Sequence, residues 1–190
     1  MSTALSSRFI HVDIDVSYDC WREWALQEHI NPEVVSFIDF RTDLLHDFDP
    51  DTNPRAFASP RSWEFVSDIL EHTNGDRHAI VSGCVGGGPA AEFLAFLEIY
   101  NSLPDVDKVL AKPDTSKVPK EPSVLYALTG SLADRMRDAK PALQKKFVTY
   151  VERMPDAFGV LAMRSAVQVN RQIIKTASGW LKDHQDLLLD

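Results

Sequence analysis

The sequence predicts a mainly α-helical protein with one N-terminal β-strand. After residue 16, apolar residues recur at three- and four-residue spacing, and helix-start signals precede several of these runs. Residues 9–16 differ because apolar and polar residues alternate there, which is typical of a half-buried strand. A second segment, 78–83, could form a short strand, but no segment matches the quality of the first. A lone strand at this position needs partners.

The helices are predicted from their caps and their apolar spacing. Ser17 or Asp19 caps the first, and Asn31 followed by Pro32 opens the second. Ser59 and Pro60 start a later helix after a loop rich in Asp, Asn and Pro. The expected helices span about 17–29, 31–40, 59–72 (with a stop at Asn74-Gly75), 89–101, 122–138, 141–154, 156–169 and 171–187.

A segment rich in proline and lysine is the best candidate for a linker. Residues 103–122 contain four prolines, which exclude one continuous helix. We therefore expect a strand segment at 1–16, a helical domain at 17–102, a linker at 103–122 and a C-terminal helical extension at 123–190.

Composition places the chain among globular proteins and excludes several function classes. Apolar residues make up 44% of the 190 residues and charged residues 25%. Cys20 and Cys84 show no metal-binding or CxxC spacing, no run is long enough for a membrane span, and the start lacks the order of a signal peptide. We therefore expect a cytoplasmic protein with two free thiols and no membrane partner.

The two halves of the chain carry different charge. Residues 1–100 hold six Arg, no Lys and 17 acidic residues, a balance of −11, whereas residues 101–190 have a balance of +3. Such an acidic first half argues against nucleic-acid binding there. It also lacks the lysine that a phosphate-binding P-loop requires, and no Gly-Lys pair occurs anywhere in the sequence.

Several candidate sites are better explained by structure than by chemistry. Asp13 and Asp15 could be paired metal-binding carboxylates, but a solvated strand face is the favoured interpretation because no third ligand is suggested nearby. His11, His46 and His78 have no ligand spacing. The glycines of "VGGGPAAEF" (85–93) could expose N–H groups to a phosphate, but without Lys or Ser/Thr we favour a tight turn between closely packed elements.

Arg61 raises the main question of the sequence. It follows Ser59-Pro60 in the first helical turn, where the helix dipole favours acids over bases. Three explanations compete: solvation, an ion pair with Asp68 or an acid of the 47–51 loop, and contact with an external anion. An anion placed between the helix N-terminus and the arginine would favour both.

A family resemblance bears on this question. "ASPRSWEFVSDIL" (58–70) resembles the sensor-two helix of MoxR-like AAA+ ATPases, and "ALSSRFIHVDIDV" (4–16) resembles the last strand of their ATPase core. The stretch from "INPEVVSFIDF" to "RSWE" and the segment "VGGGPAAEFLAFLEIYNSLPD" are similar to a phage- and bacterium-associated branch, which usually has an acid where Gly87 stands. The resemblance covers about residues 5 to 110 well and the helical tail more loosely.

The resemblance implies a helical lid domain with nucleotide contacts. Arg61 matches the sensor-two arginine, which contacts the ATP γ-phosphate, and Arg8 matches the arginine-finger position, which reaches the nucleotide of a neighbouring subunit. The always charged, planar guanidinium suits both roles. The Walker A, Walker B and sensor-one segments of the family would precede Met1. ATP with Mg is therefore expected only in a complete protein, and this chain alone should not hydrolyse it.

The resulting expectation is the C-terminal lid region of a MoxR-like ATPase with a chaperone-like role. In a complete ring it would couple ATP binding and hydrolysis to remodelling of a protein client. Its partners would be the AAA+ core or neighbouring subunits. The alternative is a free-standing helical protein-interaction module with no role in nucleotide binding. A third candidate is an enzyme that uses the face with Asp13 and Asp15.

Overall fold

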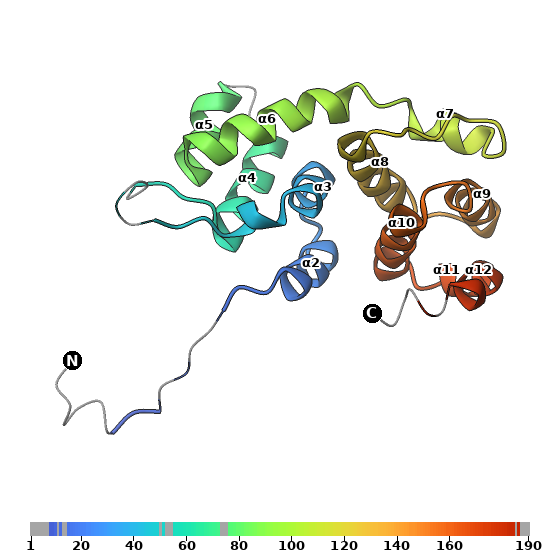
Figure 1. The fold of residues 1–190 in the computed structure, drawn as a ribbon, viewed down its shortest axis with the longest axis horizontal. Coiled ribbons are helices and arrows are strands. Elements are labelled where there is room, and N and C mark those ends of the chain that lie inside the picture. Colours follow the sequence, from blue (N-terminus) through green and yellow to red (C-terminus); the bar gives the residue numbers. More distant parts are fainter. Residues whose placement is uncertain are drawn as a thin grey trace.

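The computed structural model describes residues 8–10, 12, 15–49, 51, 55–72, 76–184 and 186, and this part of the chain is mainly helical (Figure 1). The predicted helical character is confirmed. The first half contains α2 (Tyr18–Gln27), α3 (Pro32–Phe40), the 3₁₀ turn η1 (Thr42–Leu45), α4 (Pro60–His72), α5 (Arg77–Val85) and α6 (Gly87–Asn101). The second half contains α7 (Val106–Ala111), α8 (Pro122–Arg135), α9 (Pro141–Val151), α10 (Asp156–Val169), α11 (Ile173–Thr176) and α12 (Ser178–Asp183).

The predicted caps are present at the helix starts. The Ser17 side chain accepts a hydrogen bond from the Cys20 N–H at α2, and the Asn31 side chain accepts one from the Glu33 N–H at α3. Each bond satisfies one N–H group that has no partner within the helix. The Asn74-Gly75 stop expected after α4 lies outside the described residues.

The N-terminal strand is not formed in the described part of 9–16. Phe9, Ile10, Val12, Asp15 and Val16 are in no strand, and Ile10 and Val12 are 93% and 72% exposed. A strand forms only when a neighbouring strand takes up its backbone hydrogen bonds, and no described segment pairs with these residues. In the described part of the chain, the one β-bridge joins Asp47 to Ala58 in the loop before α4.

Segment 78–83 is helical rather than a short strand. It lies in α5, which Asp76 caps by accepting a hydrogen bond from the Ala79 N–H. Val81 and Val85 are four residues apart and both are buried, so the apolar pattern of this segment serves one helix face. A short apolar run cannot be assigned to strand or helix by periodicity alone.

The C-terminal residues also depart from the expected pattern. One helix was predicted over 171–187, whereas the described residues there form the separate short helices α11 and α12. Thr176 and Gly179 flank the break, and both residue types are weak helix formers.

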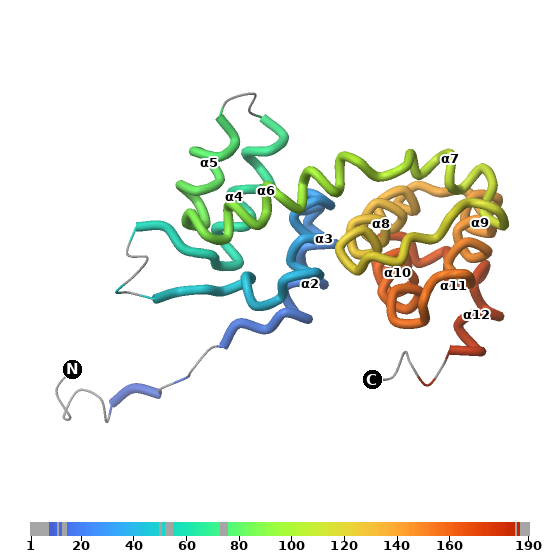
Figure 2. Tube along the Cα trace, turned by 45° about the horizontal axis from the view of Figure 1, so that its top comes forward, coloured from blue at the N-terminus to red at the C-terminus, as the bar shows by residue number. Residues whose placement is uncertain are grey.

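The helices bury two hydrophobic clusters. The first cluster is built mainly by α2–α6 and contains the fully buried Trp63, Phe37 and Phe93. The second is built by α7–α12 and contains Leu128 and Phe147. Figures 1 and 2 show α2 and α3 on the side of the first group that faces the second, between α4–α5 and α8–α10. There α3 packs against α8, and α2 packs against α10.

The segment expected to be a linker contains an ordered helix. Within 103–122, α7 places Val109 and Leu110 in the second cluster, and it contacts α8 and α9. The prolines limit α7 to one short stretch, as expected from the missing N–H groups. The division of the chain into four domain segments stays a prediction.

Candidate functional site

Arg61 lies at the second position of a well-capped helix. The Ser62 N–H donates to Ser59 Oγ (3.2 Å), and the Ser59 N–H donates to Ser62 Oγ (2.8 Å). This reciprocal pair resembles a capping box in which a serine replaces the usual Glu or Gln. The start of α4 is therefore fixed, and the position of Arg61 with it.

The Arg61 side chain is exposed and makes no ion pair with any described residue. Asp68 is exposed on the same helix and does not pair with it. An internal salt bridge with Asp68 is thus not formed. Solvation and contact with an external anion remain as explanations for this cation at a helix N-terminus.

An open hollow of about 370 Å³ lies beside Arg61, and we call it the Arg61 hollow. Its wall is mostly apolar because α2 contributes two tryptophans to it. Its lining consists of Cys20, Trp21, Trp24, Pro60, Arg61 and Glu64. Trp21 is 6% exposed, and its buried indole N–H has no hydrogen-bond partner among the described residues.

Arg8 is not brought to this hollow. It is exposed, and it is not among the residues that line the Arg61 hollow. Asp13 and His11 lie outside the described residues. His46 is exposed directly after η1, and His78 is exposed in α5. No group of metal-ligating side chains occurs in the described part of the chain.

The glycine segment is a junction between two helices. Gly86 separates α5 from α6 and has φ 86°, a left-handed conformation that favours glycine. A Cβ at this position would come within 2.9 Å of the Ala56 carbonyl oxygen. This close approach explains the glycine at position 86 structurally, as the favoured interpretation of the sequence had it. α6 begins at Gly87, two residues before the predicted Pro89.

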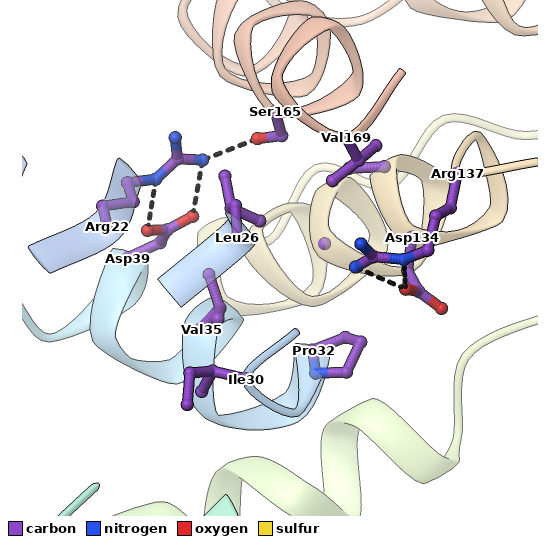
Figure 3. Close-up of a pocket in the computed structure, with 12 residues that line it drawn as sticks. Arg22, Leu26, Ile30, Pro32, Val35, Asp39, Asp134, Arg137, Ser165 and Val169 are labelled. Carbon is purple, nitrogen blue, oxygen red and sulfur yellow. Dashed lines mark hydrogen bonds and ion pairs between the residues drawn. The ribbon is translucent and has the colours of Figure 1, made fainter. Parts of the chain in front are cut away.

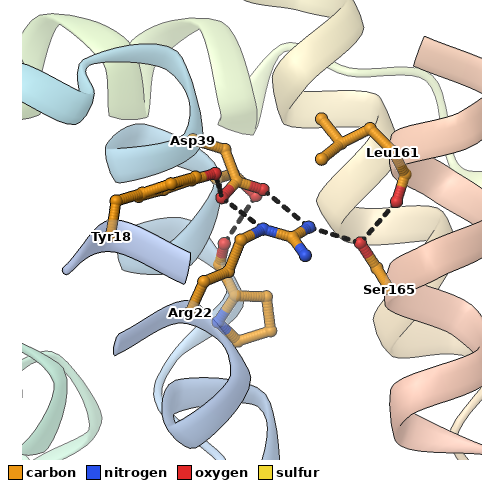
Figure 4. Close-up of polar contacts among 7 residues, drawn as sticks. Tyr18, Arg22, Asp39, Leu161 and Ser165 are labelled. Atoms are coloured by element: carbon orange, nitrogen blue, oxygen red, sulfur yellow. Dashed lines mark hydrogen bonds and ion pairs between the residues drawn. The ribbon is translucent and has the colours of Figure 1, made fainter. Parts of the chain in front are cut away.

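The structure reveals a buried polar cluster that the sequence did not suggest. Arg22 of α2 donates to both carboxylate oxygens of Asp39 of α3, at 2.7 and 3.1 Å. Arg22 also donates to Ser165 Oγ of α10 at 2.6 Å, and the Tyr18 hydroxyl donates to Asp39 at 2.6 Å (Figure 4). We call Tyr18, Arg22, Asp39 and Ser165 the polar junction, because it joins three helices.

Burial and charge act together on the titrating groups of the polar junction. Burial raises the pKa of Tyr18 far above its usual range, and the nearby Asp39 carboxylate raises it further. Burial lowers the pKa of Arg22, but the charge and hydrogen bonds of Asp39 together with the contribution of Tyr18 outweigh it, so the net shift is upward. Arg22 therefore stays charged and Tyr18 stays protonated at all ordinary pH values.

A narrow crevice continues from the polar junction between α2, α3, α8 and α10 (Figure 3). Arg137 lies at its other end, where it pairs with Asp134 at 3.3 Å and contacts His29 Nδ1 at 2.5 Å. The space open to water is about 20 Å³, which holds roughly one molecule. The crevice is therefore a packing feature and has no room for a substrate.

The polar junction carried a weak sequence signal. Tyr18 and Arg22 are four residues apart and so share one face of a helix. That face could have been recognised as polar, but its burial depends on α3 and α10, which are distant in sequence.

Comparisons with family models, curated proteins and solved structures returned no match.

Proposed function

We propose that this chain is the lid region of a MoxR-like AAA+ ATPase and couples nucleotide state to remodelling of a protein client. The observation that carries the proposal is the state of Arg61, which is exposed, unpaired among the described residues and fixed at a capped helix N-terminus. A phosphate at this place would interact favourably with the guanidinium and with the helix dipole. The sensor-two role is the one that the resemblance assigns to this residue.

A second observation supports a partner for the N-terminal segment. Phe9, Ile10, Val12 and Val16 are all exposed, and together they precede α2 without cover from any described helix. Clustered exposed apolar residues mark surfaces that another structure covers. In the family that the sequence resembles, this segment is the last strand of the ATPase core.

The test is a chimera in which the AAA+ core of a MoxR-like ATPase is joined ahead of residue 8. We expect ATP hydrolysis by the chimera and a loss on the order of 10²-fold in kcat for Arg61→Ala, because a donor to the transferring phosphoryl group is removed. Arg171→Ala is the matched control, since Arg171 is also exposed and far along the chain. Circular dichroism checks that both variants stay folded.

The opposite outcome would favour the alternative function. If Arg61→Ala hydrolyses ATP as fast as the parent chimera, the sensor role is wrong, and a helical interaction module without nucleotide duty becomes the better description. Arg8→Ala adds a further comparison. If Arg8 is an arginine finger, the Arg8→Ala substitution should lower ATP hydrolysis only in assemblies in which this subunit faces a neighbouring subunit with bound nucleotide.

A further inference from the structure

The boundary between the two hydrophobic clusters is crossed by specific contacts rather than by a loose tether. We infer that α2–α6 and α8–α10 form one rigid unit, so that the C-terminal helices are a fixed arm of the helical domain. Three independent features of the structure carry this inference. Its functional meaning, the transmission of lid movement to the C-terminal helices, rests on the proposed function.

The first feature is the polar junction. Arg22 is only 7% exposed, and its guanidinium bonds Asp39 of α3 and Ser165 of α10 at the same time. A planar guanidinium has donors in fixed directions, so it holds both partners in one geometry. Ser165 Oγ in turn donates to the Leu161 carbonyl within α10 (2.7 Å; Figure 4). The position of α10 relative to α2 and α3 is thereby specified.

The second feature is a row of aromatic rings that runs from α6 across α3 to α8 and α10. Phe96 stacks on Phe40 with ring centroids 5.8 Å apart, and Phe40 contacts Tyr126 at 5.7 Å. Tyr126 then meets the edge of Phe158 at 4.9 Å. These separations lie in the favourable range for aromatic pairs. The row connects the first cluster to the second without a gap.

The third feature is a close crossing of α3 and α8. A Cβ added at Gly130 of α8 would overlap Ser36 Oγ of α3, so a larger residue at this position would require Ser36 or one of the two helices to move. Ser36 is fully buried, and its hydroxyl donates to the Pro32 carbonyl at 2.6 Å. Tightly packed contacts of this kind resist sliding of one helix over the other.

The connection between the clusters is itself fixed to the C-terminal helices. The Tyr150 hydroxyl donates to the Lys117 carbonyl (2.9 Å), and Arg153 donates to the Ser116 carbonyl (2.8 Å). Arg135 of α8 pairs with Asp107 of α7 at 2.7 Å. The segment 103–122 therefore adds no free hinge between the two groups of helices.

The inference is tested by measuring a distance distribution across the boundary with paired spin labels. The background is the full chain with Cys20→Ser and Cys84→Ser, which removes the two free thiols. Labels at the exposed positions Asp68→Cys on α4 and Lys145→Cys on α9 should give one narrow distribution. A broad or two-peaked distribution in this background would overturn the inference, because it would show movement between the helix groups.

A matched pair of variants tests whether the polar junction holds the arm. Arg22→Lys keeps the charge beside Asp39, but its single ammonium cannot bond Asp39 and Ser165 with the same geometry. We expect the distribution to broaden at least about twofold in Arg22→Lys and to stay unchanged in Arg171→Lys. If Arg22→Lys does not fold, Ser165→Ala replaces it as the test variant. A distance distribution as narrow as that of the parent in the tested variant would rule out this role of the polar junction.

The rigid-unit inference and the proposed lid function can each be disproved without the other. The distance measurement needs no nucleotide and no ATPase core, so a narrow distribution can stand even if Arg61→Ala leaves hydrolysis in the chimera unchanged. Conversely, loss of hydrolysis in Arg61→Ala together with a broad distribution would keep the lid function and remove the rigid arm.

Discussion

At the scale of single residues, Arg22 is the least expected feature of the molecule. A charged side chain loses its hydration when it is buried, and this loss can exceed the attraction to its partner. Here the guanidinium is satisfied by Asp39 and Ser165, and Asp39 also accepts from Tyr18. We therefore expect this cluster to contribute more to the relative positions of the three helices than to the net free energy of unfolding.

His29 offers a direct test of backbone strain. It follows the end of α2 with φ 61°, and the Ile30 N–H donates to the Ala25 carbonyl at 2.9 Å, which is the arrangement of a Schellman cap. Glycine adopts this conformation without steric cost. We expect His29→Gly to raise the free energy of unfolding by roughly 0.5–1 kcal/mol in urea titrations.

A control separates the cap effect from a general effect of glycine. His72→Gly, at the last residue of α4, should lower stability because glycine is a poor helix former and because the contact of His72 Nδ1 with the Asp68 carbonyl is lost. His29→Gly also loses the contact with Arg137, but both side chains are solvent-accessible and such contacts contribute little. A less stable His29→Gly variant would contradict the strain argument.

At the scale of elements, the crossing of α3 and α8 depends on one glycine. Gly130→Ala places a methyl group against Ser36 Oγ, and the helices must separate or Ser36 must move. We expect a loss of about 1–3 kcal/mol in the free energy of unfolding, measured by thermal or urea denaturation. The adjacent Ser36→Ala change should restore part of this loss.

Gly179 is the control for this substitution. It lies in α12, and no atom of the described residues comes within 4 Å of an added Cβ, so Gly179→Ala should be neutral or slightly stabilising. If Gly130→Ala were as stable as Gly179→Ala, the close crossing would not be a packing constraint.

Element prediction from the sequence succeeded where local signals decide. Asn31-Pro32 and Ser59-Pro60 mark the starts of α3 and α4 because capping depends on neighbouring residues. It failed at 78–83, where a short apolar run suits either a strand or a helix, and at 171–187, where two short helices replace one. α7 was hidden among prolines, since its stability comes from Val109 and Leu110 packing in the second cluster.

In the candidate site, too, some features have a local sequence signal and others depend on how the helices pack. Arg61 could be singled out because an arginine in a first helical turn is locally unusual. The two tryptophans beside it come from α2, and their position depends on how α2 packs near α4. The polar junction joins residues that are 143 positions apart in the chain, and no single sequence contains a signal for such a pair.

At the scale of the whole molecule, the tyrosines predict weakening at alkaline pH. Burial and the Asp39 carboxylate raise the pKa of Tyr18, and burial raises the pKa of Tyr100 to about 12. Above pH ~10 the unfolded chain releases these protons while the folded chain keeps them. The free energy of unfolding should therefore fall as pH rises from ~10, by roughly 1.4 kcal/mol per pH unit for each tyrosine, and for Tyr100 this loss ends at about pH 12, where the folded state also ionises.

The Tyr18→Phe variant tests how much of this pH dependence of the free energy of unfolding comes from Tyr18. The variant loses the hydrogen bond to Asp39 and should be less stable by about 1 kcal/mol at neutral pH. Its stability should then decline less steeply than that of the parent above pH ~10, as measured by urea titrations at several pH values. An equal slope in both proteins would show that Tyr18 does not resist ionisation in the folded state.

The exposed apolar residues before α2 bear on how long the protein survives in a cell. Phe9, Ile10, Val12 and Val16 are exposed and belong to no described helix or strand, and exposed apolar residues of this kind favour proteolysis and aggregation. A copy of the protein in which these residues are covered should be less prone to proteolysis and to aggregation. If a partner covers these residues, as proposed above, the abundance of this protein should follow the supply of that partner, and copies without it should be degraded sooner.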